Sequence, residues 1–436
     1  MDEKQQKLKN AIKNVVLLVL FVGMLVLLSM TWMTDLSLDN IPSDSLVAKI
    51  YQRFTYGVSG FEIRTGADPA AQPTRIAVSL EGELVGAQYQ SATVSTLYVS
   101  LQEEMGQALA NCGDFDPCTE EDFCQALQGE VLYFGYEGYL PVSLLSSWMG
   151  SRAENSDKAD ALLLTADGEL YLHVADGYRV ASTSADPSDW EKAMENFSAA
   201  SCRFAVQDKT LTGVRPDTLL LEQEDMRAEQ FAVQAPQLLD SQSGSNWTAL
   251  FDAFQYDPHV STYPEDQGNT QVYAENYSTL HISVDGTVQF RATAMEGGME
   301  VYNTAETARA DTLRLQVDFA YTLLKNVQGS ISDSTQAMLY DITQADDNVC
   351  VLTFIQLVNG IPVETDSTQP FARFEFRENK LMAATIHLQQ FQSTGVQTPV
   401  LSSTLAAAAA PGEGARLAVV YQIEEQQATA RRCYVK

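Results

Sequence analysis

The clearest hydrophobic pattern in the 436-residue chain is an uncharged apolar run from Val15 to Thr34, which ends at Asp35. At about 1.5 Å per residue, a helix over these positions is about 30 Å long, the thickness of a bilayer core. Four lysines precede the run, and Trp32 lies where aromatic residues anchor helices at the membrane interface. The run is longer than the core of a signal peptide and lacks an A-x-A-like cleavage site. The pattern predicts a single membrane-spanning helix, N-terminus in the cytoplasm, in the cell membrane.

The rest of the chain contains no second apolar run of comparable length, so we expect it to be extracytoplasmic. Polar stretches at Ser151–Asp160 and Asp240–Thr248 contain few apolar residues and are typical of linkers. A chain of this length is expected to form two or three domains. The predicted organisation is a cytoplasmic tail at 1–14, a transmembrane helix at 15–34, extracytoplasmic domains at 35–152 and 153–238, and a C-terminal domain at 239–436.

Short alternating segments joined by tight turns recur through the exterior part. Three turns contain Glu81-Gly82, Asp167-Gly168 and Asp285-Gly286, and residues 377–380 join a fourth pair of segments. Dipeptides such as Asp-Gly supply the positive φ angles that two-residue hairpin turns require. The alternation of side chains along these segments predicts antiparallel sheets with one buried face.

The segment VLTFIQLVNGIPVETDS, Val351–Ser367, combines two apolar runs with Asn359-Gly360. Asn-Gly favours a hairpin turn, but Pro362 follows almost at once and lacks the N–H that an inner strand would donate. We therefore expect a strand through Leu357, a loop at Asn359-Gly360, and an edge strand that restarts at 361–363.

Helical periodicity occurs in a few segments. In the longest, Ala305–Gln328, apolar residues recur every three or four positions, as in a helix that packs on a sheet. Other helices are predicted from about Thr93 to Ala110, after the capping-box residue Ser188, and just before Pro411. The expected fold class is α+β: an N-terminal transmembrane helix followed by an extracytoplasmic region of antiparallel sheets, each packed against one or two helices.

The charge balance is strongly acidic, because 27 Lys and Arg face 57 Asp and Glu for a net charge of −30. This balance argues against nucleic acid or an anionic lipid surface as a partner of the exterior part. Acid pairs such as Glu103-Glu104 are interpreted as solvated charge rather than as calcium ligands or an acid–base pair.

The six cysteines are a weak signal. Cys112, Cys118 and Cys124 are spaced six apart, and no paired C-x-x-C or nearby histidine completes a zinc site. A local disulfide between Cys112 and Cys118 is compatible with the turn between them, and the alternative is ordinary thiols. No metal site is expected.

The sequence contains no recognisable catalytic constellation. The motifs of zinc proteases, serine hydrolases and nucleotide-binding loops are absent from the sequence. Of the four histidines, His173 and His281 fall in predicted strands, where histidine is more often structural than a ligand. We therefore expect no catalytic residue, no cofactor and no enzymatic activity. An enzyme with an unrecognised site is the least favoured alternative.

The order of elements in the last 190 or so residues resembles the YycH/YycI group of bacterial membrane proteins. The resemblance rests on LFDAFQYDP, VYAENYSTLHISVDGTVQF, the helix after Ala305, VLTFIQLVNGIPV, FARFEFRENKLMAATIHL and LAVVYQIE. The opening helix, which ends in Met-Thr-Trp-Met, is also similar to that of the family. The helix-and-hairpin unit with an embedded G-x-P-V is similar to PepSY-like modules. The run of alanines before Pro411 and the three clustered cysteines depart from the family pattern.

The resemblance implies a single-pass regulatory protein that modulates a WalK-type sensor histidine kinase through transmembrane and extracytoplasmic contacts. The implied partners are the kinase or a paralogous regulator, together with membrane lipid around the helix. Close helix packing in lipid uses small and polar residues, here Gly23, Ser29 and Thr31. The alternative function is an exported PepSY-like binding or inhibitory module that acts on a peptidase or a cell-wall component.

Overall fold

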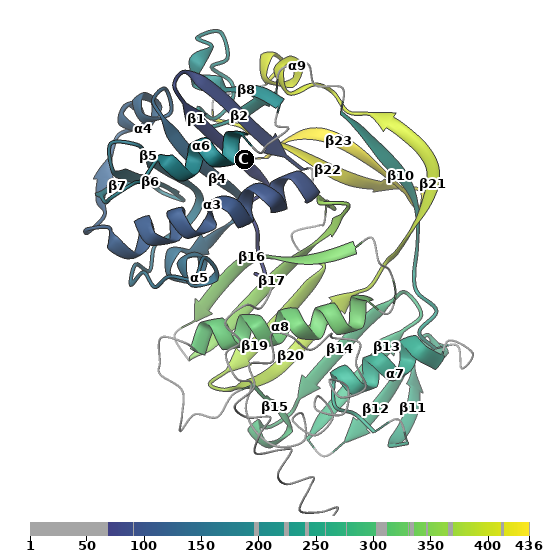
Figure 1. Cartoon of the computed structure of the whole chain (residues 1–436). Helices are drawn as coiled ribbons and strands as arrows, with labels where there is room; N and C mark the ends of the chain where they lie inside the picture. Colours follow the sequence, from purple (N-terminus) through teal and green to yellow (C-terminus); the bar gives the residue numbers. More distant parts are fainter. Residues whose placement is uncertain are drawn as a thin grey trace, which may run out of the picture. The chain divides into compact units, whose positions relative to one another are not determined.

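Strands dominate the computed structural model: of the residues that it describes, 48% are in strands and 24% in helices. All described residues belong to one compact unit, Gly60–Lys436, and form three antiparallel sheets (Figure 1). The structure describes residues 69–89, 91–195, 200–221, 226–239, 244–257, 259–275, 277–301, 312–329, 331, 335–345, 348–364, 369–410 and 414–435.

The first sheet has nine strands in the order β3-β7-β6-β5-β4-β1-β2-β8-β9. Both of its faces are buried at the centre: Ile76 and Phe134 belong to one apolar cluster, whereas the adjacent Ala77 and Tyr133 belong to another on the opposite face. The strands are β1 (Arg75–Leu80), β2 (Glu83–Gln88), β3 (Asp116–Cys118), β4 (Val131–Pro141), β5 (Lys158–Thr165), β6 (Glu169–Val174), β7 (Gly177–Ser182), β8 (Ala200–Phe204) and β9 (Leu219–Leu221).

Four helices pack on this sheet. α3 (Ser91–Asn111) contacts α5 (Val142–Trp148), α6 (Ser188–Glu195) and strand β1, and α4 (Glu120–Ala126) contacts β7. In α4, Thr119 and Asp122 form a capping box, which satisfies the first N–H groups of the helix. A 3-10 turn, η2 (Ala205–Gln207), follows β8.

The second sheet has ten strands, eight of them in the order β11-β12-β13-β14-β20-β19-β17-β16. In Figure 1, α8 (Thr312–Gly329) lies across this sheet, and α7 (Gly244–Ala253) lies near the end of the sheet that β11, β12 and β13 form. The strands are β11 (Ser261–Glu265), β12 (Thr270–Glu275), β13 (Ser278–Ser283), β14 (Thr287–Ala292), β16 (Thr335–Ala345), β17 (Val349–Val358), β19 (Ala372–Arg377) and β20 (Lys380–His387), with β15 (Met299–Glu300) on β20 and β18 (Ile361–Pro362) on β17.

The third sheet joins segments that are far apart in sequence, in the order β21-β10-β23-β22. Its strands are β10 (Arg227–Gln234), β21 (Gln390–Pro399), β22 (Arg416–Glu424) and β23 (Gln427–Val435), and α9 (Ser403–Ala408) precedes β22. Phe231 and Tyr421 pack in its core against Ile361 and Val363, which belong to the β17–β18 hairpin segment of the second sheet. A backbone bond from Glu364 N to the Tyr421 carbonyl oxygen ties the two sheets together.

The predicted fold class is wrong. The structure is mostly antiparallel sheet, and its sheets are not separate units with one or two helices each. The first sheet contacts four helices because both faces of its central strands are buried, and the apolar core of the third sheet is filled by strands and turns. No helix among the described residues is both long and apolar enough to cross a membrane. The predicted span Val15–Thr34 lies outside those residues.

The Asn359-Gly360 segment forms a two-residue hairpin turn, so the predicted loop is wrong, whereas the strand through Leu357 and its restart at Ile361 are confirmed. Both residues have positive φ, 50° and 78°, and Val358 pairs directly with Ile361. Pro362 pairs with Leu357, one position further along. In an antiparallel pair the backbone groups of successive residues alternately face the partner strand and face away from it, and at Pro362 they face away. Its missing N–H therefore costs the hairpin no hydrogen bond.

The other predicted hairpins are confirmed. Strands meet across Glu81-Gly82, Asp167-Gly168 and Asp285-Gly286, and Arg377 pairs with Lys380 around a two-residue turn. The helices predicted near residues 93–110, after Ser188 and before Pro411 are α3, α6 and α9. The predicted domains 35–152 and 153–238 contribute strands to one and the same sheet, since β4 pairs with β5.

Candidate functional site: a buried ion network beside a cavity

Two irregularities in neighbouring strands bring charged side chains into the interior. The β4–β5 pairing runs to Gly135↔Ala161 and resumes at Leu140↔Ala159, so residues 136–139 all lie opposite Asp160. On its other side, Asp160 is skipped by the pairing with β6. Bulges of this kind bend a strand and redirect its side chains. They place Glu137 and Asp160 where regular strands would place apolar residues.

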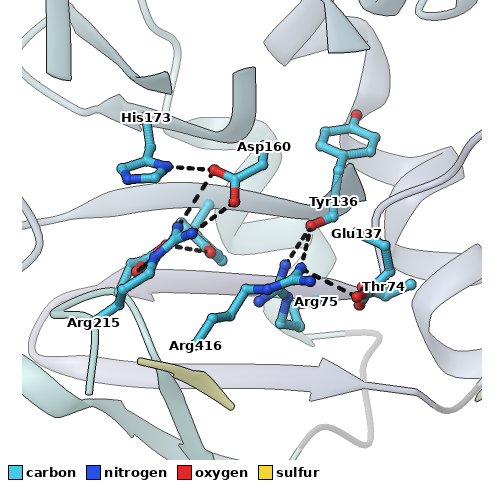
Figure 2. Close-up of polar contacts among 10 residues, drawn as sticks. Thr74, Arg75, Tyr136, Glu137, Asp160, His173, Arg215 and Arg416 are labelled. Atoms are coloured by element: carbon cyan, nitrogen blue, oxygen red, sulfur yellow. Dashed lines mark hydrogen bonds and ion pairs between the residues drawn. The ribbon is translucent and has the colours of Figure 1, made fainter. Parts of the chain in front are cut away.

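Glu137 forms an ion pair with Arg416, and Arg75, from the opposite end of the described chain, bonds to the neighbouring Tyr136 carbonyl oxygen (Figure 2). Arg416 Nη1 lies 3.1 Å from Glu137 Oε2, and the Thr74 hydroxyl donates to Oε1 over 2.6 Å. Arg75 and Arg416 both donate to the carbonyl oxygen of Tyr136. Burial by itself would raise the pKa of Glu137, but Arg416 and Arg75 bring it below its ordinary value.

Asp160 belongs to a second group of charges (Figure 2). Arg215 lies between two carboxylates, with Nη1 2.6 Å from Asp160 Oδ2 and Nη2 2.6 Å from Asp217 Oδ2. His173 Nδ1 lies 2.5 Å from Asp160 Oδ1, and the Tyr133 hydroxyl donates to Asp217 over 2.9 Å. Burial opposes the charged form of both acids, but the bonds from His173 and Arg215 to Asp160, and from Arg215 to Asp217, keep both pKa values low.

The two groups form one network that balances its own charge. A Cβ added at Gly135 would lie 2.7 Å from the Tyr133 hydroxyl oxygen and 3.0 Å from Arg75 Nε, and Tyr133 donates to Asp217, so the two groups are neighbours. Three arginines face three carboxylates, each of them less than one-tenth exposed. Buried ion pairs tolerate burial only when each charge is matched and hydrogen-bonded. The network therefore fastens β22 and the segment before β9 onto strands β1, β4 and β5.

An Asp–His pair can orient a general base, as in catalytic triads. His173 is packed between two rings, with centroids 6.0 Å from that of Tyr139 and 5.0 Å from that of Tyr178. Within the described segments, no serine, threonine or cysteine bonds to its ring, and no cluster of acidic, histidine or cysteine side chains could hold a metal. Within the described residues, the His173 ring contacts the Asp160 carboxylate and the two tyrosine rings.

A cavity of about 460 Å³ adjoins the network. Thr74 and Tyr89 line it, and Glu137 lies behind them: burial, followed by the charge of Glu137, raises the pKa of Tyr89 to about 12. Among the lining residues, Lys325 carries the one charged side chain. The walls are Pro69, Ala70, Ala71, Gln72, Pro73, Thr74, Tyr89, Val94, Ser95, Tyr321, Lys325, Gln328, Gly329, Thr335, Gln336, Ala337, Met338, Leu357 and Gly360.

The cavity lies where the first and second sheets meet. Next to it, Leu339 N of β16 donates to the Ala70 carbonyl oxygen over 2.8 Å. Further along the same junction, Gly138 of the β4 bulge lies against the backbone of Tyr340, and Lys158 Nζ donates to the carbonyl oxygen of Ile342. An occupant of the cavity would touch α3 and the residues before β1 on one side, and α8, β16 and β17 on the other.

The site residues predicted from sequence lie elsewhere. Gly23, Ser29, Thr31 and Trp32 lie outside the described residues. Cys112 and Cys118 are both free thiols, as are the other four cysteines, so the bridge considered between them is not formed in this structure. Burial raises the pKa of both thiols. His173 and His281 occupy strands β6 and β13, as predicted.

Sequence reasoning did not identify the ion network. Its members come from segments that are up to 341 positions apart, as with Arg75 and Arg416, and each charge by itself resembles a surface residue. The closest sequence signal is Arg215-Pro216-Asp217, which lies one residue before the apolar run Leu219–Leu221. The bulges that bury Glu137 and Asp160 leave no comparable mark.

The network predicts acid sensitivity. Asp160 and Asp217 have folded pKa values below 3.8, and Glu137 has one below 4.5, so their stabilisation is complete above those values and is lost as pH falls below them. Urea unfolding of the full chain between pH 7 and pH 3 is expected to show a falling free energy of unfolding. Asp160→Asn should flatten this acid slope, and an unchanged slope would contradict the assignment.

No protein-family model and no curated protein sequence matches the chain.

Proposed function

We propose that this protein is a membrane-anchored, non-catalytic regulator whose extracytoplasmic part binds a partner and modulates a membrane sensor histidine kinase. The observation that carries the proposal is the cavity at the junction of two sheets, whose lining residues come from both. The ion network beside it commits its charges to joining distant segments.

A regulator must bind its partner differently in two states, and a coupling of about 1–3 kcal/mol is enough. An occupant of this cavity contacts both sheets at once, so its binding free energy depends on how they pack against each other. A cavity lined by both sheets therefore supports the proposal that binding and packing are coupled.

The sequence supports the membrane part of the proposal. The apolar run Val15–Thr34 has the length of a span, and Gly23, Ser29 and Thr31 are the small or polar residues through which it would contact helices of the kinase. The resemblance to the YycH/YycI group supports a kinase as the partner.

The proposal is tested by kinase output in cells that carry a transcriptional reporter. Replacing Val15–Thr34 with an unrelated span is expected to remove regulation, because specific helix contacts are lost. Filling the cavity with Ala71→Phe should change output at least about fivefold, since a coupling of 1–3 kcal/mol corresponds to roughly 5–150-fold.

Val284→Phe is the matched control, because Val284 is 52% exposed and does not line the cavity. It should leave output unchanged at equal protein level. If output is the same in the helix replacement and in Ala71→Phe as in the wild type, the proposed function is wrong.

A further inference from the structure

The edge of the second sheet is open beside the cavity. β16 is the last strand of its sheet and pairs on one side with β17. Leu339 N donates away from β17, to the Ala70 carbonyl oxygen. In an antiparallel pair, residues two apart direct their backbone groups the same way, and the register is regular from Thr335 to Leu339. The N–H and C=O of Ala337 therefore also point away from β17.

Ala337 lines the cavity and is 7% exposed. Among the described residues, no backbone or side-chain group bonds to its outward N–H or C=O. Unpaired strand edges are templates on which another strand can add. An unpaired strand edge that is buried and opens into a cavity has the geometry of a binding site for an extended chain.

A second polar group in the same cavity has no partner. Gln328 of α8 is 4% exposed, and its Nε2 makes no hydrogen bond within the described part of the chain. A buried amide without a partner costs free energy unless a ligand satisfies it. It lines the wall that α8 contributes, so a ligand on the β16 edge could reach both groups.

We propose that the cavity binds a short peptide in extended conformation, which adds as a strand to the outer edge of β16 at Ala337 and bonds to the Gln328 amide. The inference rests on the proposed function in assigning a binding role to this cavity, and it names the ligand class. Strand addition of this kind is a recurrent mode of peptide recognition.

The size and charge of the cavity define the peptide further. Its volume of about 460 Å³ is within the range of ligand sites. The edge from Thr335 to Met338, which stops short of the Leu339 N–H already bonded to Ala70, is about 10 Å long at roughly 3.3 Å per residue and accommodates about three residues. Apart from Lys325 the lining residues are uncharged, so a peptide of uncharged residues fits better than a basic one.

The test uses the purified full-length chain in detergent and a library of end-blocked pentapeptides, half with an uncharged central residue and half with a central Lys. Affinity selection with mass spectrometry should retain peptides with an uncharged central residue, and the most enriched peptide is then titrated by calorimetry. Gln328→Leu is expected to weaken its binding at least threefold, and Ala337→Pro, which removes the edge N–H, at least tenfold.

Gln356→Leu is the matched control, because Gln356 is also a buried amide with an unpartnered Nε2 but does not line the cavity. It should change binding less than twofold. If Ala337→Pro does not fold, hydrogen exchange at the Ala337 amide of the wild-type chain is measured instead. The bound peptide should slow this exchange at least tenfold.

Failure to retain any library peptide, or equal binding by the wild type and Gln328→Leu with no protection of the Ala337 amide, would overturn the inference. The kinase takes no part in this measurement. A peptide that binds as described while cavity variants leave kinase output unchanged would refute the proposed function and leave the peptide site standing.

Discussion

Replacing Arg215 with methionine is expected to lower the free energy of unfolding by roughly 3–5 kcal/mol at pH 7, the usual cost of removing one partner from a buried ion pair. Arg215 lies between Asp160 and Asp217, within 2.6 Å of a carboxylate oxygen of each. Without it, two buried carboxylates face each other with only His173 and Tyr133 as partners. Urea unfolding followed by fluorescence of the buried Trp190 measures the loss.

The pH dependence of this variant is expected to be opposite in sign to that of the wild type. In the wild type, Arg215 lowers the pKa of both acids, so acidification removes stabilisation. In the variant, burial and mutual repulsion raise both pKa values, so protonation relieves the strain and the difference from wild type narrows as pH falls. A difference that stays constant from pH 7 to pH 4 would contradict this account.

Arg431→Met is the control for Arg215→Met. Arg431 pairs with Glu424 over 3.0 Å, but these side chains are 50% and 65% exposed. Exposed ion pairs contribute about 0–1 kcal/mol. An equal loss of stability in both variants would show that burial of the network is not what makes Arg215 important.

The second large effect is expected for Gly138→Ala, at about 1–3 kcal/mol. A Cβ on Gly138 would overlap the carbonyl oxygen of Tyr340 and lie 2.7 Å from its carbonyl carbon. Both obstacles are backbone atoms of β16, which cannot rotate away as a side chain can. The substitution should therefore force apart the β4 bulge and β16, and lower the urea midpoint of the full chain.

Gly113→Ala is the matched control, because its Cβ would meet nothing closer than an oxygen of Ser182 at 3.9 Å. It should change the free energy of unfolding by less than about 0.5 kcal/mol, as exposed substitutions usually do. If Gly138→Ala is equally mild, the contact between the two sheets is looser than the structure shows.

Hairpins were the most predictable part of the fold, because their signals are local. Asp285-Gly286 between alternating segments specifies a turn by its own φ preferences, and the structure confirms it. The helix α8 was likewise visible as a stripe, and Val317, Ala320 and Leu324 are buried as expected. The error at Asn359-Gly360 arose because the direction in which Pro362 faces depends on register, which a proline does not reveal.

The candidate site was not predictable in the same way. Glu137, Asp160 and Arg215 each look like solvated charges; the bulges in β4 and β5 bury the two acids, and Arg215 is buried with Asp160 and Asp217 as partners. The cavity depends on how the segment before β1 approaches the edge of β16, a contact between Ala70 and Leu339 across 269 positions. Neither contact leaves a periodic trace in the sequence.

The sequence by itself determined the local elements and the acidic charge, because turn propensity, strand alternation and helical stripes act over a few residues. Tertiary structure alone decided which strands share a sheet, which charges are buried, and where β16 keeps an open edge. Those features depend on pairing and packing between distant segments, whose free energy is gained only when the segments meet.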